Sequence, residues 1–140
     1  MKLSSVQASF PESSLSLPVM ASRLAAGFPS PADDFIESYL DLNKYLIKHP
    51  AATIFAWAEG DSLKDIGIHS GDLLIIDRAV ERRHGAIVVA AIDGELTCKV
   101  LDAKRNRLLP ANSHYLPIEL AGRDDVIIEG VIIYNIKSQY

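Results

Sequence analysis

The sequence predicts a mainly β fold, a barrel or sandwich that carries a flexible N-terminal arm and one short helix. Three observations support this class. Short apolar runs follow Pro50 at close spacing, with turn residues and little helical pattern between them. The pair Asp93–Gly94 lies between two such runs and is a strong signal for a two-residue hairpin. The chain has 140 residues, of which 49% are hydrophobic, and this suits one domain with a substantial core.

The first 30 residues differ from the rest of the chain. They are rich in Ser, contain Pro11, Pro18 and Pro29, and show little hydrophobic periodicity. This composition predicts a flexible arm that is not part of the core. The arm is too short to supply a helix-turn-helix DNA-binding domain.

A short helix is expected after the arm. Ser30 is a suitable N-cap and Pro31 a suitable first helical residue, and acidic residues follow in the first turn. Pro50 ends the helix. The apolar residues at helical spacing are Phe35, Ile36, Tyr39 and Leu40, with a possible extension through Leu42, Tyr45, Leu46 and Ile47.

Beyond Pro50 the apolar runs are typical of β-strands. Each is short, and Gly, Asp, Ser or Pro bounds most of them. No internal repeat is present. The expected strands cover residues 53–58, 73–76, 86–92, 96–101, 108–110 and 126–133.

Charge and composition exclude several classes of function. A net charge of −4 disfavours direct DNA binding, which depends on clustered Lys and Arg, but it allows action beside DNA through a protein partner. The single cysteine, Cys98, cannot form an internal disulfide, and the histidines show no metal-ligand spacing. No apolar run is long enough to span a membrane, and Pro and charged residues interrupt the N-terminal stretch that could pass for a signal peptide. We therefore expect a cytoplasmic protein without a metal site.

The segment EGDSLKDIG, residues 59–67, contains a candidate nucleophile, Ser62. Its GDSL letters match a family of esterases, which also need a DxxH motif for their Asp and His. The four residues that lie three positions before the histidines are Leu46, Ile66, Glu81 and Ala111, and none is Asp. The nucleophile-elbow pattern G-x-S-x-G also fails, because Lys64 stands where the second Gly is required. A histidine-activated serine is therefore not expected.

A lysine can also activate a serine, provided that the lysine is neutral. An ordinary lysine has a pKa of about 10.4, and burial in apolar surroundings favours its neutral form. Lys99 is the lysine that lies inside an apolar β run, between Cys98 and Val100. The alternation of a strand also allows Lys99 to face solvent, and Ser62 could be an ordinary turn residue, so both interpretations stay open on the residues alone.

An ordered set of motifs resembles the LexA/UmuD-type self-cleaving peptidases, from about Ala26 to the end of the chain. The resemblance implies a LexA/signal-peptidase-like β fold. Ser62 and Lys99 are 37 residues apart, as in that family. The motifs are AGFPSPADD, LDLNKYLIKHPAAT, GDSLKDIGIHSGDLLIIDR, HGAIVVAAIDGE and TCKV.

The resemblance also implies roles for particular residues. Ser62 would be the nucleophile, Lys99 the general base, and the bond between Ala26 and Gly27 the cleavage site. The domains would then be an arm, residues 1–26, that self-cleavage removes, and a peptidase-like β domain, residues 27–140. Two positions depart from the UmuD pattern, since that branch commonly has Cys before the Gly and Met where this chain has Leu63.

The partners implied by the resemblance belong to the bacterial SOS response. A RecA–single-stranded DNA filament would stimulate cleavage, and the trimmed homodimer would join a UmuC-type polymerase subunit in translesion synthesis. No cofactor is implied. The main alternative is a non-catalytic, polymerase-binding or regulatory subunit of the same fold. A signal-peptidase-like enzyme that acts on other chains would need a membrane anchor, and a phage-type repressor would need a DNA-binding head.

Overall fold

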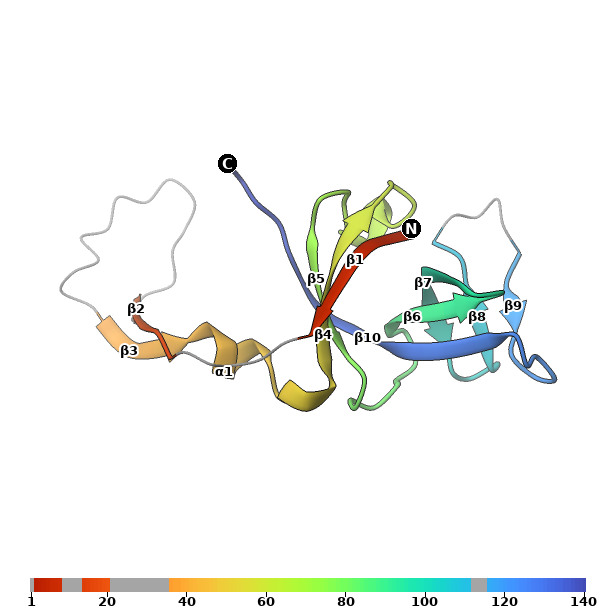
Figure 1. Cartoon of the computed structure of the whole chain (residues 1–140), viewed down its shortest axis with the longest axis horizontal. Helices are drawn as coiled ribbons and strands as arrows, with labels where there is room; N and C mark the ends of the chain where they lie inside the picture. The colour runs from red at the N-terminus through yellow and green to blue at the C-terminus, as the bar shows by residue number, and fades with distance from the viewer. Residues whose placement is uncertain (1, 9–13, 21–35, 112–115) are drawn as a thin grey trace. The chain divides into compact units, whose positions relative to one another are not determined.

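The computed structural model describes residues 2–8, 14–20, 36–111 and 116–140 (Figure 1). The described residues form two compact units, one with β1 and β4–β10 and the other with β2, β3 and α1. The helical segments are α1 (Leu42–Leu46) and the 3-10 turns η2 (Pro50–Ala52) and η3 (Lys64–Ile66). The strands are β1 (Lys2–Ala8), β2 (Ser16–Met20), β3 (Ile36–Asp41), β4 (Thr53–Glu59), β5 (Leu73–Asp77), β6 (Ile87–Ile92), β7 (Glu95–Asp102), β8 (Arg107–Leu109), β9 (Ile118–Glu119) and β10 (Val126–Ile136).

The larger unit is one antiparallel sheet of eight strands in the order β1-β4-β5-β10-β6-β7-β8-β9. Its first six strands close into a barrel, because β1 also pairs with β7 through Lys2 and Thr97. The long strand β10 pairs with β6 at its start and with β5 at its end (Figure 1). Irregularities in register beside Gly130 and Tyr134 mark this change of partner. The mainly β class predicted from the sequence is confirmed.

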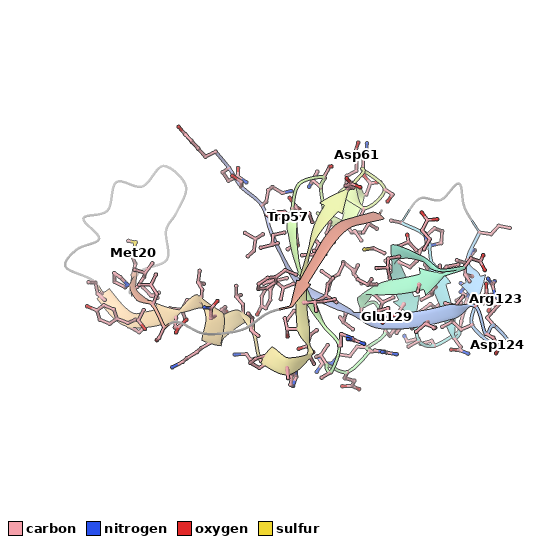
Figure 2. All side chains as sticks on the ribbon, viewed as in Figure 1. Met20, Trp57, Asp61, Arg123, Asp124 and Glu129 are labelled. Carbon is pink, nitrogen blue, oxygen red and sulfur yellow. The ribbon has the colours of Figure 1, made fainter. Side chains whose placement is uncertain are left out.

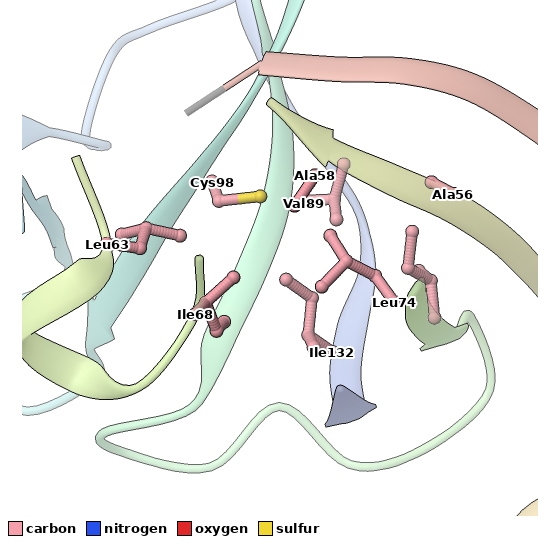
Figure 3. Close-up of a cluster of buried hydrophobic side chains, with 9 residues drawn as sticks. Ala56, Ala58, Leu63, Ile68, Leu74, Val89, Cys98 and Ile132 are labelled. Carbon is pink, nitrogen blue, oxygen red and sulfur yellow. The ribbon is translucent and has the colours of Figure 1, made fainter. Parts of the chain in front are cut away.

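Two clusters of buried side chains fill the larger unit. The second core cluster comprises Val88, Ala90, Leu101, Leu108 and Val131. The first core cluster comprises Ala56, Ala58, Leu63, Ile68, Leu74, Ile76, Val89, Cys98 and Ile132 (Figure 3). Val88 and Ala90 of β6 belong to the second core cluster and Val89 to the first, because side chains alternate between the two faces of a strand.

The strands predicted after Pro50 agree with those of the structure to within a few residues. Asp93–Gly94 forms the β6–β7 turn, and both residues have positive φ angles, 51° and 79°, as a type I′ hairpin requires. Gly tolerates such angles without a steric penalty. The apolar runs were therefore sufficient to place β4, β5, β6, β7, β8 and β10.

The helix predicted from Ser30 is wrong over Ile36–Asp41, which form strand β3 paired with β2. The helix is shorter and begins at Leu42, and Asp41 caps it by accepting a hydrogen bond of 3.0 Å from the Asn43 N–H. Ile36, Tyr39 and Leu40 fit a strand as well as a helix, since β-branched and aromatic residues favour strands. Ser30 and Pro31 lie outside the described residues.

Two strands lie within the stretch that the sequence predicts as a flexible arm. Lys2–Ala8 form β1 on the edge of β4, and Ser16–Met20 form β2 beside β3. Backbone pairing satisfies an open sheet edge without requiring a strongly apolar strand. Composition therefore does not reveal these two strands.

Candidate active site

Ser62 lies on the loop of residues 60–72, which joins β4 to β5. Figure 2 labels Trp57 on β4, before the loop, and Asp61, which precedes Ser62 in the sequence. The loop enters the core at Leu63 and Ile68, which are 0% and 1% exposed. Both the Ile66 and Ile68 N–H groups donate to the Leu63 carbonyl, at 3.0 and 3.2 Å. Ser62 itself is exposed, so a tightly folded loop presents its hydroxyl at the surface.

Lys99 lies in the middle of β7, where it pairs with Val88 of β6. Its neighbour Cys98 is 1% exposed and faces the first core cluster, so Lys99 projects from the other face of the strand. Lys99 is half-buried there. The position combines apolar neighbours with access to the surface.

The first core cluster brings the two elements together. Leu63 follows Ser62 and Cys98 precedes Lys99, and both Leu63 and Cys98 belong to this cluster (Figure 3). Among the described residues, no hydrogen bond joins the Ser62 hydroxyl to the Lys99 amine. Catalytic hydrogen bonds often lengthen without substrate and tighten when it docks. The cleavage-site residues Ala26 and Gly27 lie outside the described residues.

Strand β1 pairs with β4, which leads into the serine loop, and with β7, which carries Lys99. Its first residue, Lys2, pairs with Glu59, three positions before Ser62, and with Thr97, two positions before Lys99. The N-terminal strand therefore connects the edge of β4 to β7 close to the candidate dyad.

Asp72 closes the serine loop at its β5 end, and its side chain is 3% exposed. Burial alone would raise the pKa of this carboxyl group, but hydrogen bonds outweigh burial and lower the pKa below its ordinary value. The donors are the His69 N–H, the Lys137 ammonium and the Asn135 amide, each at 3.0 Å. Sequence reasoning missed Asp72, because Asn135 and Lys137 are more than 60 residues away along the chain.

The lowered pKa of Asp72 predicts a loss of stability in acid. An unfolded Asp has a pKa of about 3.9, so the contribution of Asp72 is complete above that pH and is lost as pH falls through the lower folded value. At neutral pH, Asp72→Asn should lower the free energy of unfolding by about 1–3 kcal/mol, since it removes a charged hydrogen-bond acceptor. Urea unfolding at about pH 7 and about pH 3 should show the difference narrowing in acid. An equal difference at both pH values would contradict this assignment.

Cys98 is a free cysteine in the first core cluster. Burial raises the pKa of the Cys98 thiol to about 11, so Cys98 is a neutral thiol at physiological pH. Within the described ranges, no three His, Cys, Asp or Glu side chains gather in a way that could hold a metal ion. The same residues include no helix with the length and apolar character needed to cross a membrane.

The barrel thus carries the serine loop and the lysine-bearing strand β7 against one core cluster. A family model described as Peptidase S24-like matches residues 18–133, and the chain therefore belongs to this family. The resemblance to LexA/UmuD-type peptidases drawn from the sequence motifs is confirmed.

Individual relatives cover most of the chain. Protein SamA of Salmonella typhimurium is 52% identical over 99 residues, 70% of this chain and 71% of the relative. Protein ImpA of Escherichia coli is 44% identical over 119 residues, 85% of this chain and 82% of the relative. Protein MucA of Escherichia coli is 39% identical over 124 residues, 86% of this chain and 84% of the relative.

Proposed function

We propose that this protein is a serine endopeptidase that cleaves its own chain between Ala26 and Gly27 through a Ser62/Lys99 dyad. The observation that supports the proposal is the first core cluster, which includes both Leu63, the residue after Ser62, and Cys98, the residue before Lys99. Membership of the Peptidase S24-like family supports the same chemistry.

The mechanism begins with neutral Lys99, which accepts the proton of the Ser62 hydroxyl. The serine oxygen then attacks the Ala26 carbonyl, and the N–H of Ser62 with a neighbouring loop N–H would stabilise the oxyanion. The tetrahedral intermediate collapses to an acyl-enzyme on Ser62, and the amine of Gly27 leaves with the proton from Lys99. Water hydrolyses the ester and frees Ser62. The small residues at the cleavage site allow the extended chain to approach closely.

The tether between substrate and catalyst makes regulation necessary. Because both lie in one chain, the effective concentration of the cleavage segment is high. A weakly populated docked conformation would keep cleavage slow until a partner favours it. We infer that this partner is a RecA–single-stranded DNA filament.

The cellular role that we propose is SOS mutagenesis in the cytoplasm. The trimmed product, residues 27–140, would form a homodimer and join a UmuC-type polymerase subunit in translesion synthesis. The relatives SamA, ImpA and MucA support a UmuD-like protein of this kind. No cofactor and no direct contact with a specific DNA sequence are part of the proposal.

Addition of a RecA filament tests this function. The filament should accelerate formation of the fragment that begins at Gly27, whereas RecA without single-stranded DNA should not. Purified parent that remains intact under both conditions and at alkaline pH would favour the non-catalytic, polymerase-binding alternative.

Cleavage should also uncover the edge of β4, because residues 1–26 include β1. The Ala58 N–H donates to the Asp72 carbonyl on the β5 side, so the alternation of a strand places the Phe55 and Trp57 N–H groups on the β1 side. Hydrogen exchange followed by NMR should be at least about tenfold faster at these two amides in the product than in the Ser62→Ala full-length chain. Ala56 and Ala58 serve as internal controls. Unchanged exchange at Phe55 and Trp57 would contradict the release of β1.

A further inference from the structure

Two residues near the end of β10, Asn135 and Lys137, form hydrogen bonds to the serine loop. The Asn135 amide donates two hydrogen bonds of 3.0 Å, one to the Gly67 carbonyl and one to the Asp72 carboxylate. The Lys137 ammonium binds both oxygens of the same carboxylate at 3.0 Å. Core packing therefore fixes the loop at Leu63 and Ile68. Hydrogen bonds from Asn135 and Lys137 fix it at Gly67 and Asp72.

At Gly67, the hydrogen bond from Asn135 acts directly on the backbone of the loop. It ends the turn η3, has a φ of 89°, and donates its N–H to the Lys64 carbonyl. Its own carbonyl accepts the bond from Asn135. Because η3 begins two residues after Ser62, the Asn135 bond fixes the end of the turn that follows the serine along the loop.

Asn135 can be replaced without unfolding the barrel. Its side chain is exposed, so truncation leaves no buried cavity. Asp72 keeps Lys137 as its counter-charge when Asn135 is replaced. The bond to the Gly67 carbonyl is lost.

We propose that Asn135 is a positioning residue for Ser62, acting through its hydrogen bonds to the Gly67 carbonyl and the Asp72 carboxylate. The inference rests on the proposed self-cleavage by Ser62. Displacement of the serine by about 1 Å can lower the cleavage rate roughly a hundredfold. Loss of these bonds should therefore lower the cleavage rate under conditions where the protein is still folded.

The test compares the full-length parent with Asn135→Ala and with Asn135→Leu, which keeps the approximate size of the side chain. Tyr134→Ala is the matched control, because Tyr134 is adjacent on β10 and projects from the opposite face. Two rates are measured at a temperature where circular dichroism shows every variant to be folded. One is self-cleavage from about pH 7 to about pH 10.5, a range that reaches the ordinary lysine pKa. The other is labelling of Ser62 by a small fluorophosphonate.

Both Asn135 variants should lower the alkaline plateau of the cleavage rate by roughly 10- to 100-fold without moving the midpoint of the pH profile. Labelling should fall by a similar factor, while Tyr134→Ala should stay within about twofold of the parent on both measurements. A purely structural role would leave both rates unchanged in folded protein. Parental rates in both Asn135 variants would overturn the inference. A parent that is labelled but does not cleave would count against the proposed function, and the labelling rates would still decide the role of Asn135.

Discussion

Replacement of Ser62 by alanine is expected to abolish formation of the Gly27 fragment. The serine oxygen is the atom that forms the acyl-enzyme, and its removal in serine peptidases lowers the rate by a factor on the order of 10⁶. Ser62 is exposed on its loop, so the variant should unfold at the same temperature as the parent. Intact-mass measurements of the variant and the parent at alkaline pH compare the amounts of fragment that they form.

A second serine variant shows whether the loss of cleavage is specific to Ser62 or follows the removal of any serine hydroxyl. Ser38 is exposed on β3, and Ser38→Ala should cleave at the parental rate. Equal cleavage by Ser62→Ala and the parent would show that another group attacks the bond.

Replacement of Lys99 by alanine is expected to lower cleavage by about 10²–10⁴-fold, the usual contribution of a general base. Lys99→Arg should be as inactive, because arginine stays protonated at every accessible pH. In the parent, the rate should rise with pH, because a lysine acts as a general base only in its neutral form. Both variants should lose this rise, and gel densitometry across the pH range measures it.

Lys64 provides the control for Lys99, since it lies two residues after Ser62 and is exposed on η3. Lys64→Ala should keep both the parental rate and its pH dependence. If Lys64→Ala loses cleavage and Lys99→Ala retains it, the general base is Lys64 on the serine loop. Melting curves of all variants are needed beside these rates, so that loss of the fold is not counted as loss of chemistry.

The sequence was most informative where local signals are strong. The apolar runs and Asp93–Gly94 placed the strands of the barrel, because side-chain periodicity and hairpin geometry are local properties. It failed at Ile36–Asp41, where the apolar residues fit both helix and strand and pairing with β2 decides the outcome. Strand β1 was also missed, since the edge of β4 that it pairs with is distant in sequence.

The candidate site shows the same division. Ser62 and Lys99 could be selected from the sequence because their residue types and local settings are visible there. The packing of Leu63 and Cys98 into one core cluster could not be predicted from the sequence, because it depends on the closure of the barrel. The hydrogen bonds from Asn135 and Lys137 to Asp72 depend on the pairing of β10 with β5, which no local sequence pattern reveals.

The central claim is that the chain cuts itself once, between Ala26 and Gly27, with Ser62 as nucleophile. The most direct measurement is intact-mass spectrometry of purified parent and Ser62→Ala, incubated side by side at about pH 10, close to the ordinary lysine pKa. The account predicts two new masses in the parent, corresponding to residues 1–26 and 27–140, and an unchanged mass in Ser62→Ala. Cleavage at another bond, or the same two fragments from Ser62→Ala at the parental rate, would contradict it.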